Sequence, residues 1–184
     1  MSMENDLENL KYPIGKFEKP SMISQSQMEI WINAIEAFPK KLKEEINHLT
    51  ESQLQRQYRP NGWSIRQVVN HCADSHMNSF IRFKLALTEE TPTIKPYLEN
   101  LWAELPDSKN YPIESSLKIL EGLHKRWVYL LRGLSEKDLE KEFRHPETNA
   151  LISLKTNIGL YAWHGEHHLA HIIAAKTIRK NLVP

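Results

Sequence analysis

The sequence reads Trp163-His164-Gly165-Glu166-His167-His168-Leu169-Ala170-His171 near its C-terminal end, and this stretch holds four of the nine histidines of the chain. Residues four apart lie one above the other on an α-helix, so His164 pairs with His168 and His167 pairs with His171. Two imidazoles at this spacing are positioned before a metal ion arrives. The pattern therefore predicts a metal site on the last helix. The alternative is that these histidines are solvated cations or packing groups.

The helix that carries this stretch is expected to begin at Ser153 or Thr156 and to run to about Arg179. Its inward face combines apolar and histidine side chains: Leu154, Ile158, Tyr161, His164, His168, Ile172 and Ala175. Gly165 stands where a zincin motif has a glutamate, so the pattern is not that of a zincin.

The two histidine pairs differ in where they lie on this helix. His164 and His168 lie on the inward face, whereas His167 is displaced to its flank. The first pair is therefore favoured as the metal ligands. His171 lies near the inward face beyond His168 and is expected to line a pocket or to contact the ligands from behind.

A second helix is predicted from Ser64 to about Thr88, after the turn Pro60-Asn61-Gly62. Ser64 followed by Gln67 is a capping box. Two histidines of this helix compete as a third ligand. His76 lies in the apolar stripe and His71 lies on a more polar flank, and the spacing alone favours neither.

Two further helices complete the pattern. The first begins at Ser24, and Pro39 is expected to kink or split it. The other begins at Ser115 or Ser116 and ends at Gly133. His124 lies inside the apolar stripe of this helix, where core packing is the expected role.

A long crossover is predicted for residues 89–113, which contain four prolines. A connection of this length lets the next helix pack parallel to its predecessor. Four long amphipathic segments indicate an all-α four-helix bundle, and such bundles build metal sites from facing helices.

Shorter segments fill the rest of the chain. Residues 1–22 are expected to be irregular, 135–138 to form a short helical piece, and 143–154 to form a turn or a small hairpin. His145 precedes a proline there and is expected to be solvated. Without a repeat or a linker, the chain is expected to be a single domain over residues 1–184.

The composition excludes several classes of protein. The 184 residues carry a net charge of +1 and lack a basic stripe, which argues against nucleic-acid binding. The apolar runs are too short to span a membrane, and the polar N-terminus is no secretory signal. The single cysteine, Cys72, fits a reducing compartment and buried packing, so we expect a cytoplasmic protein.

Three stretches of this sequence resemble a known family. They are Tyr12-Pro13-Ile14-Gly15, the segment GWSIRQVVNHCADSHMN at 62–78, and the segment LYAWHGEHHLAH at 160–171. These stretches closely resemble the YfiT branch of the DinB/YfiT-like superfamily, and the similarity extends over nearly the whole chain.

The resemblance implies a four-helix bundle of up-down-down-up connectivity. It also implies one divalent metal ion per subunit, zinc or alternatively nickel, bound by His71, His164 and His168. The choice of His71 over His76 follows from this resemblance. It further implies a homodimer and a metal-dependent hydrolase, while some relatives are thiol S-transferases that use bacillithiol.

Three imidazole ligands leave coordination positions open, as in catalytic zinc sites. Either a bound water or a bound thiol then attacks a small electrophilic substrate, which gives hydrolysis or S-transfer. No catalytic base is assigned, because Asp74 and Glu166 are expected to be solvated. Arg66 and Arg82 are expected at the surface or beside an anionic cosubstrate. Two other functions remain open: a metal-binding stress-response protein without catalysis, and a helical interaction module without metal.

Overall fold

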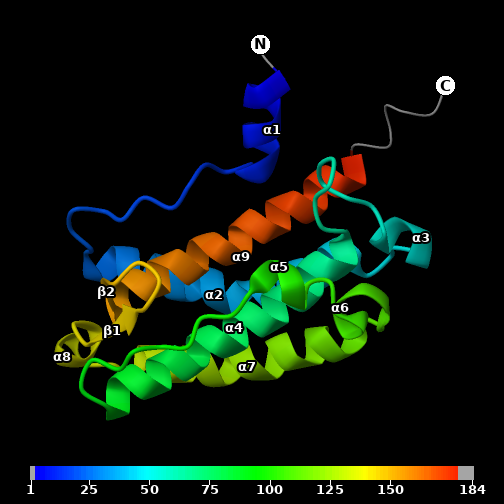
Figure 1. The fold of residues 1–184 in the computed structure, drawn as a ribbon. Coiled ribbons are helices and arrows are strands. Elements are labelled where there is room, and N and C mark those ends of the chain that lie inside the picture. Colours follow the sequence, from blue (N-terminus) through cyan, green and yellow to red (C-terminus); the bar gives the residue numbers. More distant parts are fainter. Residues whose placement is uncertain (1–2, 178–184) are drawn as a thin grey trace.

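The computed structural model describes residues 3–177 and shows a bundle of four long helices (Figure 1). These are α2 (Gln25–Ile46), α4 (Ile65–Thr88), α7 (Glu114–Arg132) and α9 (Leu154–Thr177). In Figure 1, α2 and α9 run in one direction and α4 and α7 run in the other. Both α4 and α2 pack against α7 and against α9. The up-down-down-up bundle implied by the resemblance is therefore confirmed.

Local signals set the ends of these helices. Ser24 caps α2 and accepts a hydrogen bond from the backbone of Gln27. Ser64 and Gln67 form the predicted capping box of α4, and Gly133 ends α7. Of the two effects predicted for Pro39, a kink or a split, the split is wrong, because α2 is continuous through this residue. The buried side chains of Phe38 and Leu42, on either side of this proline, hold α2 in the core as one helix. Both residues belong to the apolar core of the bundle.

The predicted crossover joins α4 to α7 and contains two short helices, α5 (Glu99–Trp102) and α6 (Pro106–Asn110). Hydrogen bonds attach this crossover to the first two turns of α4. The amide of Gln67 donates to the carbonyl of Ala103 at 2.8 Å, and the amide of Asn70 donates to that of Ser108 at 3.0 Å. The crossover thereby returns the chain to the end of the bundle where α4 began, so α7 runs parallel to α4.

Short elements close the two ends of the bundle. The helix α3 (Glu51–Leu54) follows α2, and α8 (Glu136–Leu139) follows α7. The predicted hairpin consists of β1 (Glu142–His145) and β2 (Ala150–Ser153), paired antiparallel.

The prediction of an irregular N-terminal segment needs correction, because α1 covers Met3–Lys11. The prediction rested on Pro13 and Pro20, and both follow this helix. The extended part beyond α1 lies along α9, where the indole of Trp163 donates to the carbonyl of Gly15 at 3.2 Å. Residues 1–2 and 178–184 lie outside the described structure, and so does Arg179, where the last helix was predicted to end.

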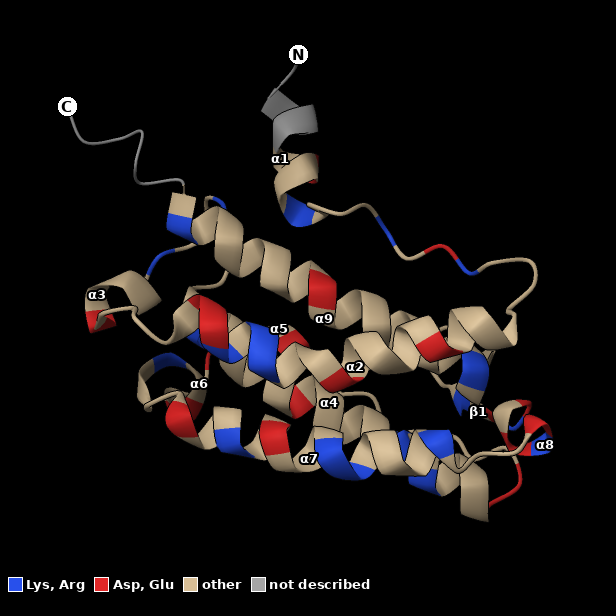
Figure 2. Ribbon diagram, turned by 180° about the vertical axis from the view of Figure 1, so that it is seen from behind, with Lys and Arg blue, Asp and Glu red and all other residues tan. Residues whose placement is uncertain are grey.

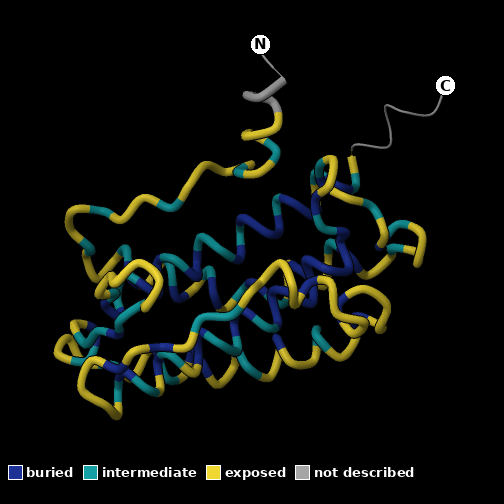
Figure 3. Tube along the Cα trace, viewed as in Figure 1, coloured by how far each residue is buried: buried dark blue, intermediate teal, exposed yellow. Residues whose placement is uncertain are grey.

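The last helix, α9, departs from the amphipathic pattern expected of all four helices. It is buried on most sides, because α2, α4 and the N-terminal segment all cover it (Figure 3). Figure 2 shows how few charged residues it carries, and Glu166 is the one acidic residue among them. Two glycines on α9 let α2 approach closely, since a Cβ at Gly159 or Gly165 would lie within 3.0 Å of an aromatic ring of α2. Within residues 3–177, no helix is long and apolar enough to cross a lipid bilayer.

Candidate metal centre

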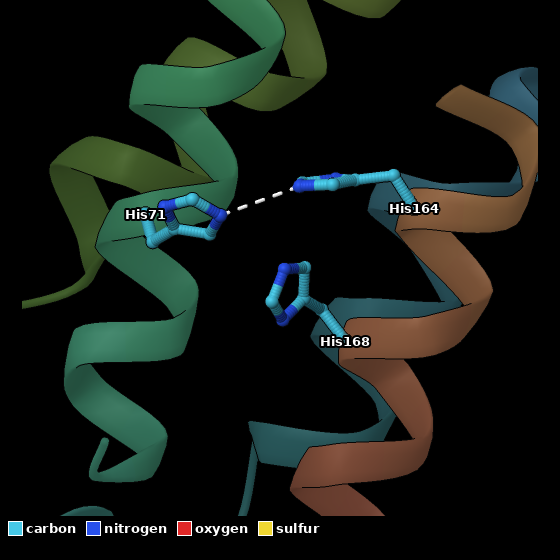
Figure 4. A group of neighbouring side chains, drawn as sticks. All are labelled: His71, His164 and His168. Atoms are coloured by element: carbon cyan, nitrogen blue, oxygen red, sulfur yellow. Dashed lines mark hydrogen bonds between the residues drawn. The ribbon is translucent and has the colours of Figure 1, made fainter. Parts of the chain in front are cut away.

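The rings of His71, His164 and His168 meet between α4 and α9 (Figure 4). His71 comes from the second turn of α4, and the other two come from successive turns of α9. The Nε2 atoms of His71 and His164 lie 3.3 Å apart, and one ring nitrogen from each of the three histidines lies within 4.8 Å of the others. The fold therefore brings the three predicted ligands together.

This spacing fits a small divalent ion. Zinc lies about 2.0–2.1 Å from an imidazole nitrogen, so two ligands of a tetrahedral site lie about 3.4 Å apart. The 3.3 Å between His71 and His164 matches that edge of the tetrahedron. A ring nitrogen of His168 lies within 4.8 Å of both others, so it is the third candidate ligand of the same ion.

Burial keeps these imidazoles neutral. It lowers the pKa of His71 to about 4, and the neighbouring His167 and His171 lower it further. Burial also holds the pKa values of His164 and His168 well below their usual range, with contributions from the other histidines of the cluster. Neutral rings keep a lone pair free, which is the form that binds a metal ion.

Polar and aromatic groups surround the three rings. The hydroxyl of Ser75 lies 3.4 Å from His164 Nε2, and the phenol of Tyr161 donates to the Ser75 carbonyl at 3.1 Å. The ring of Trp63 lies 4.7 Å from that of His71, measured between centroids. Trp63 directly precedes the capping box of α4, so this local turn places an apolar wall beside the histidines.

His76, the alternative third ligand, lies behind His164. Its Nε2 is 3.1 Å from His164 Nδ1, and its Nδ1 is 2.7 Å from His124 Nε2. The Nδ1 of His124 in turn lies 2.6 Å from the backbone carbonyl of Ile35. The predicted core location of His124 is confirmed, since its exposure is 2%. Its contact with His76 was not predicted, because helical spacing within α7 says nothing about partners on α4.

The second histidine pair of α9 lies beside the first. His167, His168 and His171 also have ring nitrogens within 4.8 Å of one another, so this group shares His168 with the candidate site. His171 contacts His168 through the two Nδ1 atoms at 3.3 Å and contacts the carbonyl of Lys11 through Nε2 at 3.1 Å. His167 stacks on Trp163, with 4.5 Å between ring centroids.

Two other side chains considered in the sequence, Arg66 and Cys72, are buried. The surface location considered for Arg66 is wrong, because its side chain is buried and paired with Glu51 and the Tyr111 carbonyl. Cys72 is fully buried, and burial raises the pKa of its thiol, which fits packing.

Of the two carboxylates that were expected to be solvated, Glu166 lies at the surface and Asp74 is partly buried. Glu166 pairs with Lys41 at the surface, at 2.6 Å. Asp74 is half-buried instead of solvated, and burial, followed by the charge of Asp107, raises its pKa to about 6.

Comparison with known proteins decides the family of this chain. The sequence profile of the DinB superfamily matches residues 34–172. The chain belongs to the DinB superfamily. The matched range begins within α2 and ends within α9, and it contains all of α4 and α7 and all three histidines of the candidate site.

Close relatives of this DinB-superfamily chain come from Bacillus. Proteins of Bacillus cereus (strain 03BB102) and Bacillus thuringiensis subsp. konkukian (strain 97-27) are each 54% identical over 176 residues, which is 96% of this chain and 99% of the relative. Both carry the name "Putative metal-dependent hydrolase".

A solved structure is also similar. YfiT from Bacillus subtilis, described as a probable metal-dependent hydrolase with an unusual four-helix bundle topology, superposes with a TM-score of 0.91 at 49% identity. The match covers 94% of this chain and 98% of YfiT. The fold and the family are thus shared along nearly the whole length.

Proposed function

We propose that this protein is a metal-dependent hydrolase in which His71, His164 and His168 hold one divalent ion, with zinc as the expected metal. The observation that carries the proposal is the convergence of three buried or half-buried imidazoles, with ring nitrogens within 4.8 Å of one another and 3.3 Å between two of them, which is the edge of a tetrahedral zinc site. The names of the relatives and of YfiT support the same reaction class.

Three protein ligands are the number found in catalytic zinc sites, which keep a position for water or substrate. A bound divalent ion supplies Lewis-acid chemistry, because it lowers the pKa of a water or thiol and creates a nucleophile at neutral pH. The chain itself contributes the shape of the site. Trp63 shields the histidines on one side, and the Ser75 hydroxyl lies within hydrogen-bonding reach of a substrate placed near His164.

A thiol S-transferase is the second candidate function, and one observation favours it. The two histidine groups found within residues 3–177 contain no carboxylate. Metallohydrolases with an HExxH motif use a glutamate as the general base for water. A thiol is acidic enough to lose its proton at a metal without such a base. A low-molecular-weight thiol would then be the cosubstrate, and a small electrophile the acceptor.

The two reactions can be separated by assaying untagged, zinc-loaded protein with two sets of substrates. One set contains activated esters and anilides in water, and the other contains small electrophiles with and without a low-molecular-weight thiol. His168→Ala removes a candidate ligand, and His48→Gln, at an exposed position of the surface, is the matched control. Turnover without thiol that is lost in His168→Ala supports the hydrolase. Turnover that requires thiol supports the transferase.

A catalytically inactive metal protein would give a different result. In a cobalt-substituted sample, added thiol or azide should change the visible spectrum if a coordination position is open. An unchanged spectrum, together with no turnover on either set of substrates, would contradict both enzymatic functions.

A further inference from the structure

Each candidate ligand of α9 contacts a further histidine behind it. His164 Nδ1 lies 3.1 Å from His76 Nε2, and His168 Nδ1 lies 3.3 Å from His171 Nδ1. Both contacts are nitrogen to nitrogen, so one ring must donate a proton and the other must accept it. The direction of donation decides which nitrogen of each ligand remains free.

The direction of the first series of contacts is fixed at its far end. The Ile35 carbonyl can only accept, so the nitrogen 2.6 Å away, His124 Nδ1, carries a proton. A neutral His124 then accepts at Nε2 from His76 Nδ1, which is 2.7 Å away. By the same reasoning His76 accepts at Nε2 from His164 Nδ1. We call this series, from His164 through His76 and His124 to the Ile35 carbonyl, the His76 relay.

The second series of contacts ends in the N-terminal segment. The Lys11 carbonyl accepts from His171 Nε2 at 3.1 Å, which leaves His171 Nδ1 without a proton. This nitrogen therefore accepts from His168 Nδ1. We call this series, from His168 through His171 to the Lys11 carbonyl, the His171 relay.

Both deductions require each ring to hold one proton. His76, His124 and His171 are 1%, 2% and 2% exposed. Their ring nitrogens contact other imidazoles and backbone carbonyls. A buried positive charge without a charged partner is unfavourable, so each ring holds one proton and offers one donor and one acceptor.

We propose that His76 and His171 are positioning residues that fix the tautomers of His164 and His168, so that both ligands present a proton-free Nε2 to the same ion. This inference rests on the proposed function, because it assigns the relays a role toward that ion. Metal-binding histidines in proteins are commonly oriented by such a hydrogen bond from the other ring nitrogen. Here the bond goes to a second histidine. His171 is bonded directly to a backbone carbonyl, and His76 is connected to one through His124.

The relays also explain the second group of histidines on α9. In the His171 relay, the proton on His168 Nδ1 is shared with His171 Nδ1, so neither nitrogen is free for another ion. The group of His167, His168 and His171 therefore supports the candidate site instead of forming a second one. Because Lys11 ends α1, the same relay links the N-terminal segment to the ligand His168.

The tautomers can be read directly by NMR on the full-length protein with ¹⁵N-labelled histidine rings. In metal-free protein, we expect a proton on Nδ1 of His76, His124, His164 and His168. We also expect a proton on Nε2 of His171. After zinc is added, the Nε2 resonances of His164 and His168 should show the change expected of coordination. A proton on Nδ1 of His171, or zinc bound through Nδ1 of either ligand, would overturn the proposal.

Paired variants test the positioning role through zinc affinity. His76→Gln keeps an acceptor near the Nε2 position and His76→Met removes it at similar size. His171→Asn and His171→Leu form the corresponding pair near the Nδ1 position. Loss of the hydrogen bond from Nδ1 of the metal ligand should weaken zinc binding roughly 10- to 100-fold in the Met and Leu variants. The Gln and Asn variants should stay within a few-fold of wild type.

Thermal stability, measured on the same metal-free variants, distinguishes positioning from a structural role. If zinc affinity fell only in proportion to thermal stability, and the Gln and Asn variants bound zinc no better than the Met and Leu variants, the positioning role would be overturned. If wild type binds no zinc, the proposed function fails. The tautomers of the metal-free protein would still show whether the two relays exist.

Discussion

His71 Nε2 on α4 and His164 Nε2 on α9 lie 3.3 Å apart, although 93 residues separate them in the chain. This closeness depends on the connectivity of the bundle. The crossover makes α7 parallel to α4, and α9 then packs beside α4 in the opposite direction. The two helices bring their histidines to the same level, so a metal ion bound there would join the second and the last helix of the bundle.

Zinc should stabilise the folded protein, because the three ligands are brought together only in the native state. At free zinc about 100-fold above its Kd, the expected gain is about 2.7 kcal/mol. For a chain of this size, that corresponds to a rise in Tm of roughly 5–10 °C. The measurement is thermal unfolding with zinc and with EDTA. His168→Ala should show no shift, whereas His48→Gln should behave as wild type.

Replacing Gly165 by alanine should destabilise the protein, because the new Cβ would lie 2.9 Å from the ring of the buried Phe38. Overpacking of this kind costs about 1–3 kcal/mol. The matched control is Gly122→Ala on α7, where a Cβ meets nothing within 4 Å. The control should stabilise by roughly 0.5–1 kcal/mol through helix propensity. Urea unfolding measures whether the free energy of unfolding falls in Gly165→Ala and rises in Gly122→Ala. Equal changes in the two variants would contradict the close approach of α2 and α9.

Acidification should destabilise the metal-free protein partly through His124. Burial lowers the pKa of this ring to about 4 from its usual 6.5. Between these values the unfolded chain binds more protons than the native state, so stability is complete above pH 6.5 and is lost as the pH falls toward 4. His124 should account for roughly 1 kcal/mol of the loss between pH 7.5 and 5.5.

Urea unfolding at the two pH values, with EDTA present, measures this contribution. The difference between the two pH values should be smaller in His124→Gln than in wild type by that amount. Replacement of the exposed His48 by Gln should leave the difference unchanged. An equal pH dependence in wild type and His124→Gln would show that His124 is not held neutral by burial.

Much of this architecture could be predicted from local chemistry. Ser24 and Ser64 marked the starts of α2 and α4 because their side chains cap backbone N–H groups, a signal within a few residues. The prolines of the crossover indicated a long irregular connection. Helix α1 was missed because it is only nine residues long and mostly polar, and because the prolines that follow it indicated an irregular segment. The burial of α9 on most sides was missed because its cover comes from distant segments.

The candidate site was predictable only in part. The spacing of His164 and His168 is a property of one helix, so the sequence alone revealed it. The choice between His71 and His76 depends on how α4 is rotated toward α9, and periodicity gave no answer. Family resemblance favoured His71, and the structure places it beside His164. The contact from His76 to His124 joins α4 to α7, and local sequence patterns hold no information on such a pairing.

Elemental analysis of protein purified without a metal-affinity tag tests the three-histidine site most directly. We expect about one zinc or similar divalent ion per chain in wild type and in His48→Gln. Each of His71→Ala, His164→Ala and His168→Ala should lose it. A wild-type protein that stayed metal-free after incubation with zinc or nickel would contradict the site. So would a His71→Ala variant that kept the ion while His167→Ala lost it, because the metal would then be bound by the other histidine group.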